Sequence, residues 1–237
     1  VFQPAEERVP GGALDVLADD GLVGVDTIFG FHCDPKLDVG RVGLRAGSIT
    51  SAADMATISI SGPGGHTARP SETVDLVDLV ARIVTSLPHS VAEAVGSPEQ
   101  VRLVFGAVHA GDAANVIPSH GRLRAAVRTP SLEVWERLPS IVRDRLTDLL
   151  AGTGAEFELD YTHGVPPVVN DSGVTASLER AAWAELGADS VTAAVQSWGG
   201  DDFAWYTRAI PGSYVRLGVR DPDAVGAPHD LHVGRFD

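Results

Sequence analysis

Two adjacent glutamates, Glu6 and Glu7, follow a short apolar run at the start of the chain. Adjacent carboxylates could supply two groups that metal-assisted hydrolysis needs. One would hold a divalent ion, and the other would take a proton from the water bound to that ion. Neighbouring side chains of an extended segment point to opposite faces, so the two glutamates can take different roles. The pair alone is not diagnostic, because most charged residues are solvated.

Three histidines stand in distinctive surroundings. His32 follows the apolar run 28–31, His66 lies in the glycine-rich loop 62–70, and His232 lies near the last residue. An imidazole can bind a metal ion, although a lone histidine is more often a surface or hydrogen-bonded residue. The glycine-rich loop lacks the Lys-Ser/Thr ending of a phosphate-binding loop and the spacing of a dinucleotide fingerprint.

Together with other segments, these residues resemble the M20 metallopeptidase family. The similarity is to the amidohydrolase branch that includes hippurate hydrolases and auxin-conjugate hydrolases. The segments occur in the order typical of that family and cover nearly the whole chain, and the ordered set carries the resemblance. Besides the segments around Glu6, His32, His66 and His232, the supporting ones are Asn115–Pro118, Val127–Thr129, Pro166–Asp171 and Gly200–Ala204.

The resemblance implies a role for each of these side chains. Glu6 corresponds to the general base, and Glu7, His32 and His232 correspond to metal ligands. His66 corresponds to a histidine that reaches the active site of a partner subunit and helps hold the substrate carbonyl as it becomes an oxyanion. The implied cofactor is one or two divalent metal ions, zinc or manganese, with cobalt as a further possibility. A loop histidine beside a glycine-rich turn is the structural alternative for His66.

Asn115 and Arg128 are candidate substrate contacts. An arginine can bind a carboxylate through two parallel hydrogen bonds. The alternative for Arg128 is a solvent-facing position on a strand, beside Arg122 and Arg124, and Asn115 could simply form a turn.

Two residues near these motifs need separate consideration. Cys33 follows His32 directly, and strand alternation predicts that it points away from the site as a small buried residue. Asp201 stands where many members of the family have Glu, which leaves the reach of this carboxylate open.

The composition excludes several classes of function. A net charge of −14 argues against nucleic acid and against anionic membranes, because both are bound by clusters of Lys and Arg. No apolar stretch approaches the roughly 20 residues that a membrane helix requires. The single Cys cannot form an internal disulfide and fits a reducing cytoplasm.

Apolar periodicity predicts the order strand, helix, strand, strand, helix, strand in the middle of the chain. Alternation marks the strands, and apolar residues three or four apart mark the helices. Ser71 and Thr129-Pro130 are the predicted helix starts. The order is that of a ferredoxin-like sandwich. The predicted strands are 54–61, 101–107, 123–128 and 155–161, and the predicted helices lie at 77–87 and 130–149.

The flanking residues alternate between strands and helices, which favours an α/β layer. A short helix is expected within 9–20 and strands near 25–31 and 214–219. A further helix is expected from Asp171 to Gly187. We therefore expect an incomplete open α/β metal-hydrolase domain, residues 1–50 and 165–237. An inserted ferredoxin-like satellite and dimerisation domain is expected at residues 51–164.

The leading hypothesis is a metal-dependent amidohydrolase that cleaves N-acyl amino acids or related small amides. It would act as a cytoplasmic homodimer through the satellite domain. The alternative is an M20-like binding or assembly module without a complete metal site. The family's N-terminal metal-binding segment is not found in this sequence, so we expect an N-terminally truncated piece that is inactive by itself.

Overall fold

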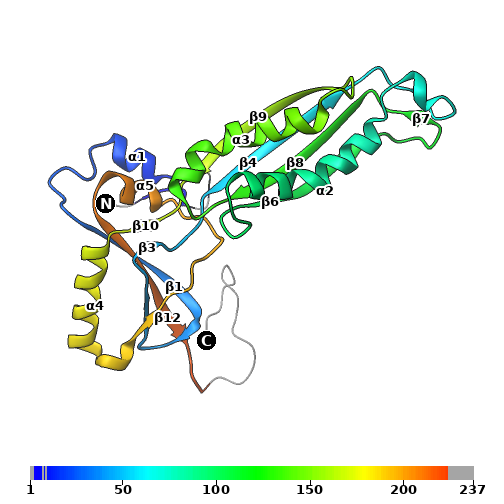
Figure 1. Ribbon diagram of the computed structural model, residues 1–237. Coiled ribbons are helices and arrows are strands. Elements are labelled where there is room, and N and C mark those ends of the chain that lie inside the picture. Colours follow the sequence, from blue (N-terminus) through cyan, green and yellow to red (C-terminus); the bar gives the residue numbers. More distant parts are fainter. Residues whose placement is uncertain (1–2, 7, 9, 224–237) are drawn as a thin grey trace. The chain divides into compact units, whose positions relative to one another are not determined.

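The structure is a computed structural model that describes residues 3–6, 8 and 10–223. The chain divides into two units, which Figure 1 shows in sequence colours. Unit 1 combines residues 1–51 with residues 165–237, and unit 2 is the segment 52–164 between them. The prediction of a mixed α/β protein is confirmed.

Unit 2 contains a four-stranded sheet with the strand order β6-β8-β4-β9. Strand β8 pairs antiparallel with both β4 and β6. Along β4 the side chains of Ala56, Ile58 and Ile60 are at most 1% exposed and alternate with partly exposed residues, as the sequence pattern predicts. The strands are β4 (Ala53–Ser61), β6 (Arg102–Ala110), β8 (His120–Arg128) and β9 (Glu156–Val165).

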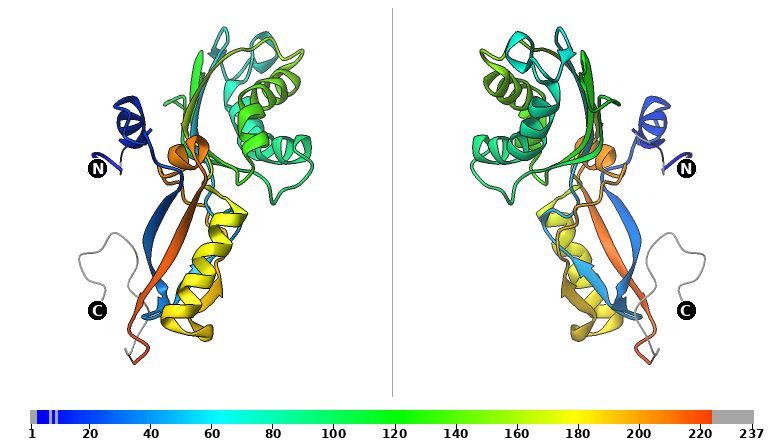
Figure 2. Two further views of the ribbon diagram at one scale, coloured as in Figure 1. Left: turned by 90° about the vertical axis from the view of Figure 1, so that its left-hand side faces the viewer. Right: turned by 90° about the vertical axis from the view of Figure 1, so that its right-hand side faces the viewer.

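Two helices, α2 (Leu76–Ala94) and α3 (Leu132–Leu150), cover one face of this sheet, as Figure 2 shows. Their apolar sides meet the inward side chains of the strands in a single core. Full burial of one such side chain contributes about 1.5–3 kcal/mol, so this core is the main source of stability in unit 2. Side chains at its centre include Ile83 and Leu87 of α2 and Leu138, Val142 and Leu146 of α3.

Both helices begin after the starting residues that the sequence predicts, Ser71 and Thr129-Pro130. The Asp75 side chain accepts hydrogen bonds from the Val77 and Asp78 amides at 3.1 and 3.2 Å, so Asp75 and not Ser71 is the N-cap of α2. Ser71 instead lies in a short 3-10 helix, Pro70–Glu72. Helix α3 is capped by Ser131 rather than entered at Thr129-Pro130. The two predicted starts were wrong because a Ser or Thr near a Pro has the chemistry of an N-cap. The sequence does not show which nearby side chain accepts the hydrogen bonds of the first helix amides.

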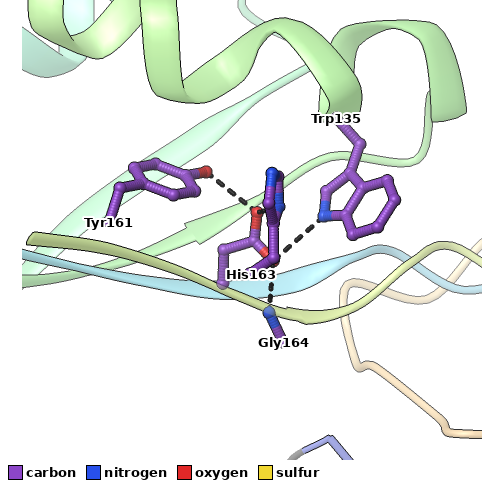
Figure 3. Close-up of polar contacts among 5 residues, drawn as sticks. Trp135, Tyr161, His163 and Gly164 are labelled. Carbon is purple, nitrogen blue, oxygen red and sulfur yellow. Dashed lines mark hydrogen bonds and ion pairs between the residues drawn. The ribbon is translucent and has the colours of Figure 1, made fainter.

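A buried carboxylate, Asp54 of β4, ties several elements of unit 2 together (Figure 3). One oxygen accepts hydrogen bonds from Trp135 Nε1 at 3.0 Å and from the Gly164 amide at 2.8 Å. The other accepts from the Tyr161 hydroxyl at 2.9 Å and lies 3.1 Å from His163 Nδ1. Four donors therefore satisfy a carboxylate whose side chain has no exposed surface.

Unit 1 contains a sheet with the strand order β1-β12-β2-β11. The pairs β1–β12 and β2–β11 are parallel, and β12–β2 is antiparallel. The predicted strand near 214–219 is β12. The strands are β1 (Ile28–Asp38), β2 (Val42–Leu44), β11 (Val191–Ala193) and β12 (Gly212–Arg220).

Helix α4 (Ser172–Leu186) packs on this sheet through Ala182, which joins a small core with residues of β2 and β12. It begins and ends where the sequence predicts. Asp171 accepts from the Val174 amide at 2.8 Å, and Gly187 ends the helix at φ 92°. No helix in the described part of the chain combines the length and apolar character needed to cross a membrane.

The remaining elements of unit 1 are short. Helices α1 (Ala13–Ala18) and α5 (Ala204–Ala209) contribute Ala13, Ala204 and Tyr206 to a second core. Strands β3 (Gly47–Ser48) and β10 (Val169–Asn170) pair antiparallel.

Candidate functional site

Three carboxylates of unit 1 lie close together, and one of them is the predicted general base, Glu6. Glu6, Asp201 and Asp202 each offer an oxygen, and these oxygens all lie within 4.8 Å of one another. Glu6 is exposed, whereas Asp202 is only 3% exposed. The fold thus brings residue 6 next to a segment nearly 200 positions away in the sequence.

Asp201 is held by two hydrogen bonds. Its Oδ1 accepts from the Phe203 amide at 2.9 Å, and its Oδ2 accepts from the Tyr214 hydroxyl. Burial raises the pKa of Tyr214, and the charge and the hydrogen bond of Asp201 act in the same direction, as does the Glu6 charge. Tyr214 therefore remains a neutral donor at neutral pH and fixes the Asp201 carboxylate next to Glu6.

The ring of His32, a predicted metal ligand on β1, is oriented by the backbone carbonyl of the next residue, Cys33. Its Nδ1 lies 2.7 Å from the Cys33 carbonyl oxygen, which can only accept, so Nδ1 must carry the proton. The other ring nitrogen, Nε2, is then the nitrogen that can bind a metal ion. Metal-binding histidines commonly donate their second N–H in this way to a carbonyl or carboxylate. The free electron pair on Nε2 of His32 is therefore suited to bind a divalent ion.

Tyr214 links the segments of His32 and Glu6, because its ring lies near His32 and its hydroxyl donates to Asp201, which lies beside Glu6. The His32 and Tyr214 rings have centroids 5.9 Å apart, and Tyr214 lies beside Gly30 in the β1–β12 register. A Cβ atom on Gly30 would lie 2.9 Å from ring atoms of Phe203 and Tyr214, so a glycine is needed for this approach. Tyr214 could not be identified as a site residue from the sequence, because the apolar run that contains it indicates only a strand.

Two of the predicted metal ligands, Glu7 and His232, lie outside the described residues. The convergence of Glu7, His32 and His232 on one ion therefore stays a prediction. The prediction for Cys33 was wrong, because its side chain is exposed. Phe29 and Phe31 share this face of β1 and are exposed as well, so within the described residues no other layer covers the face that bears Cys33.

In unit 2 the structure brings His66 and Asn115 together. Strand β5 (Gly65–His66) pairs with β7 (Val116–Ile117), and the Thr67 amide donates to the Asn115 carbonyl at 3.2 Å. His66 Nδ1 accepts from the Ala68 amide at 3.0 Å. In the neutral ring the proton then sits on Nε2, which is the form that donates a hydrogen bond to an oxyanion.

Arg128 lies apart from that pair. It is the last residue of β8. The first residue of that strand is His120, which comes three residues after the end of β7. Eight steps along a strand correspond to about 27 Å. Asn115 precedes the His120 end of β8 in the chain, whereas Arg128 is the last residue of that strand, so the two predicted substrate contacts do not lie at the same end of it.

The fold is that of a known class of metal-binding peptidases. The solved structure of the Bacillus subtilis YXEP protein, described as a dinuclear metal binding peptidase from the M20 family, matches with a TM-score of 0.77 and 33% identity. The match covers 92% of this chain and 54% of that one. The model of Peptidase family M20/M25/M40 matches residues 1–237, and this chain belongs to that family.

Curated relatives agree with the family but are longer. An N-acetylcysteine deacetylase of Bacillus subtilis is 36% identical over 219 residues, which cover 92% of this chain and 57% of the deacetylase. A Rhodococcus jostii protein that carries a glutamate–cysteine ligase name is 44% identical over 237 residues, all of this chain but 30% of that protein. The chain thus spans between about a third and three fifths of the length of such relatives.

Proposed function

We propose that this chain forms part of a metal-dependent amidohydrolase that cleaves N-acyl amino acids or related small amides. The observation that carries the proposal is that Tyr214 links Glu6 and His32. Glu6 supplies a carboxylate that lies beside two other carboxylates. His32 supplies an imidazole whose Nδ1–H donates to the Cys33 carbonyl, which leaves Nε2 for a metal ion.

In this proposal Glu6 takes the proton of the attacking water and returns it to the leaving nitrogen. Glu7, His32 and His232 would hold one or two divalent ions, with zinc or manganese as the proposed metals and cobalt as a further option. A divalent ion in such a site polarises the amide carbonyl and lowers the pKa of bound water to about 7.

The substrate class follows from the chemistry of the remaining residues. Arg128 is proposed to bind the carboxylate of the amino acid through its guanidinium, and Asn115 to hydrogen-bond the amide. His66 is proposed to donate its Nε2–H to the developing oxyanion. N-acetylcysteine is a suitable first substrate, because one relative is a deacetylase of that compound.

We further propose a cytoplasmic homodimer that forms through unit 2, with His66 acting in the partner's site. The separation of His66 from Arg128 along β8 supports a site that draws these two residues from different subunits. The metal-free binding module is the weaker alternative, because it gives no reason for the orientation of His32.

The test is Glu6→Gln in the enzyme of full length. We expect loss of N-acetylcysteine hydrolysis with unchanged metal content, because the amide cannot accept the proton but leaves the ligands in place. Glu185→Gln, an exposed change on α4, is the matched control and should retain activity. Retained turnover in Glu6→Gln would refute the general-base role, and loss of metal would make Glu6 a ligand.

A further inference from the structure

The carboxylate of Asp202, which is buried, accepts hydrogen bonds from residues on both sides of Glu6. Before Glu6, Gln3 Nε2 donates to both oxygens of Asp202, at 2.8 and 2.7 Å. After Glu6, the Ala13 amide donates to Asp202 Oδ2 at 3.1 Å. Asp202 is 3% exposed, so these bonds are shielded from competing water. Residues 3 and 13 are therefore held at one point, with Glu6 between them.

Two glycines allow the ends of this segment to come so close. A Cβ on Gly11 would lie 2.2 Å from Asp202 Oδ2, and the residue has φ +91°. A Cβ on Gly12 would lie 1.8 Å from the Pro4 carbonyl oxygen. Both positions exclude a side chain, so the backbone itself packs against Asp202 and Pro4.

The orientation of Gln3 is fixed by a second contact. Its Oε1 accepts from the Tyr206 hydroxyl at 2.7 Å, which directs its Nε2 to Asp202. Ala5, directly before Glu6, has φ 52°. This left-handed conformation costs about 1–2 kcal/mol for a residue with a Cβ, and it persists where the surroundings hold the backbone.

Asp202 is better suited to holding this segment than to binding a metal ion. Both of its oxygens already accept hydrogen bonds, although it belongs to the group of three carboxylates described above. Burial raises the pKa of Asp202, and the bonds from Gln3 and Ala13 act in the opposite direction. A buried carboxylate is tolerated where such donors satisfy it.

We propose that Asp202 is a positioning residue, which fastens residues 3–13 and thereby fixes the Glu6 carboxylate at the place where it acts on water. The inference rests on the proposed role of Glu6. It predicts that the bond between Gln3 and Asp202 can be reversed in polarity without loss of function, because its geometry is what matters.

The catalytic test compares Asp202→Asn, Gln3→Glu and the double variant in the enzyme of full length. In Asp202→Asn one oxygen still accepts from the Ala13 amide, but the NH2 group that replaces the other oxygen faces the NH2 group of Gln3. Gln3→Glu places two carboxylates together. Displacement of a reacting group by about 1 Å can cost on the order of a hundredfold in rate, so each single variant should lose at least about tenfold in kcat. KM and metal content should stay close to wild type. The double variant restores a donor–acceptor pair and should recover most of the lost kcat.

A structural measurement on the 237-residue chain is independent of turnover. The Ala13 amide starts α1, so it has no partner within the helix and is protected by Asp202. Its hydrogen exchange, and tryptic cleavage after Arg8, should both accelerate about tenfold or more in the single variants and slow again in the double variant. Asp15→Asn, an exposed change two residues from Ala13, is the control and should leave both rates and kcat unchanged.

The outcomes separate this inference from the proposed function. Unchanged exchange and cleavage in both single variants would refute the fastening by Asp202, whatever the activity. Faster exchange with unchanged kcat would refute its role in positioning Glu6. If Glu6→Gln itself retains turnover, the proposed function fails, and the exchange data still report whether Asp202 holds the segment.

Discussion

Asp54 provides the clearest residue-scale test of how unit 2 is held together. In Asp54→Ala both oxygens are lost, so Trp135 Nε1 and the Gly164 amide, which can only donate, are left without their acceptor. Each buried donor left without an acceptor costs about 1–3 kcal/mol, so we expect a loss of about 2–6 kcal/mol in the free energy of unfolding. Chemical denaturation of the 237-residue chain measures this.

The matched control is Asp160→Ala on β9, where the side chain is exposed. Its free energy of unfolding should stay within about 0.5 kcal/mol of wild type. Equal effects of the two substitutions would mean that the four hydrogen bonds do not stabilise the unit.

Tyr161 gives unit 2 a dependence on alkaline pH. Burial raises the pKa of Tyr161 above its ordinary value of 10.0, and the neighbouring Asp54 acts in the same direction. The unfolded chain therefore releases this proton first. The stabilising contribution is complete below about pH 10 and is lost as pH rises above it.

Tyr161→Phe removes the proton and should flatten that decline, by up to about 1.4 kcal/mol per pH unit. The measurement is the free energy of unfolding between about pH 9 and pH 11.5, where the reference tyrosine ionises. An unchanged slope would show that Tyr161 ionises equally well in the folded state.

The residue types of the candidate site could be predicted, but their partners could not. Glu6 and His32 stand in motifs that indicate metal hydrolysis. Tyr214 lacks such a signal, and Asp202 stands in the supporting segment Gly200–Ala204, which does not indicate its bond to Gln3 about 200 residues away in the sequence. Hydrogen-bond partners so far apart follow from the fold and not from local spacing.

At the scale of elements, the start of α2 is a direct test of capping. Asp75→Ala removes the acceptor of two helix amides and should cost about 1 kcal/mol. Ser71→Ala, at the start that the sequence predicts, should change the free energy of unfolding by less than about 0.5 kcal/mol. Thermal and chemical unfolding of both variants would decide between them, and a larger effect at Ser71 would contradict the structure.

Periodicity identified the strands and helices of unit 2 because each has one buried and one solvated side. Strand β4 and helix α2 are typical, with apolar residues at steps of two and of three or four. Helix starts were harder, since Asp75 and Ser71 both have the chemistry of a cap. Cys33 was misjudged because alternation assigns a side chain to one face of a strand but does not tell whether another layer covers that face.

At the scale of the whole molecule, the sequence does not tell which residues of one subunit serve one site. His66 and Asn115 lie together near the His120 end of β8, while Arg128 ends that strand about 27 Å from His120. A small substrate cannot span that distance. The proposed homodimer accounts for it, because symmetry lets the end of unit 2 that bears His66 serve the site of the other subunit.

Mixing two inactive variants of the enzyme of full length tests this arrangement. His66→Ala keeps the general base but loses the oxyanion donor, and Glu6→Gln does the reverse. If His66 acts in the partner's site, each mixed dimer contains one complete site, made of Glu6 from one subunit and His66 from the other. Random exchange of subunits at equal concentrations should then restore about a quarter of wild-type activity.

The control replaces the His66→Ala protein with a variant that carries both substitutions. No mixed dimer then has an intact Glu6, so activity should stay absent although subunits exchange as before. Exchange itself is followed with subunits that carry two different affinity tags. If activity stays absent in the first mixture after exchange is complete, His66 serves its own subunit's site or has no part in catalysis. Recovery in the first mixture alone would establish that the two subunits share their active sites.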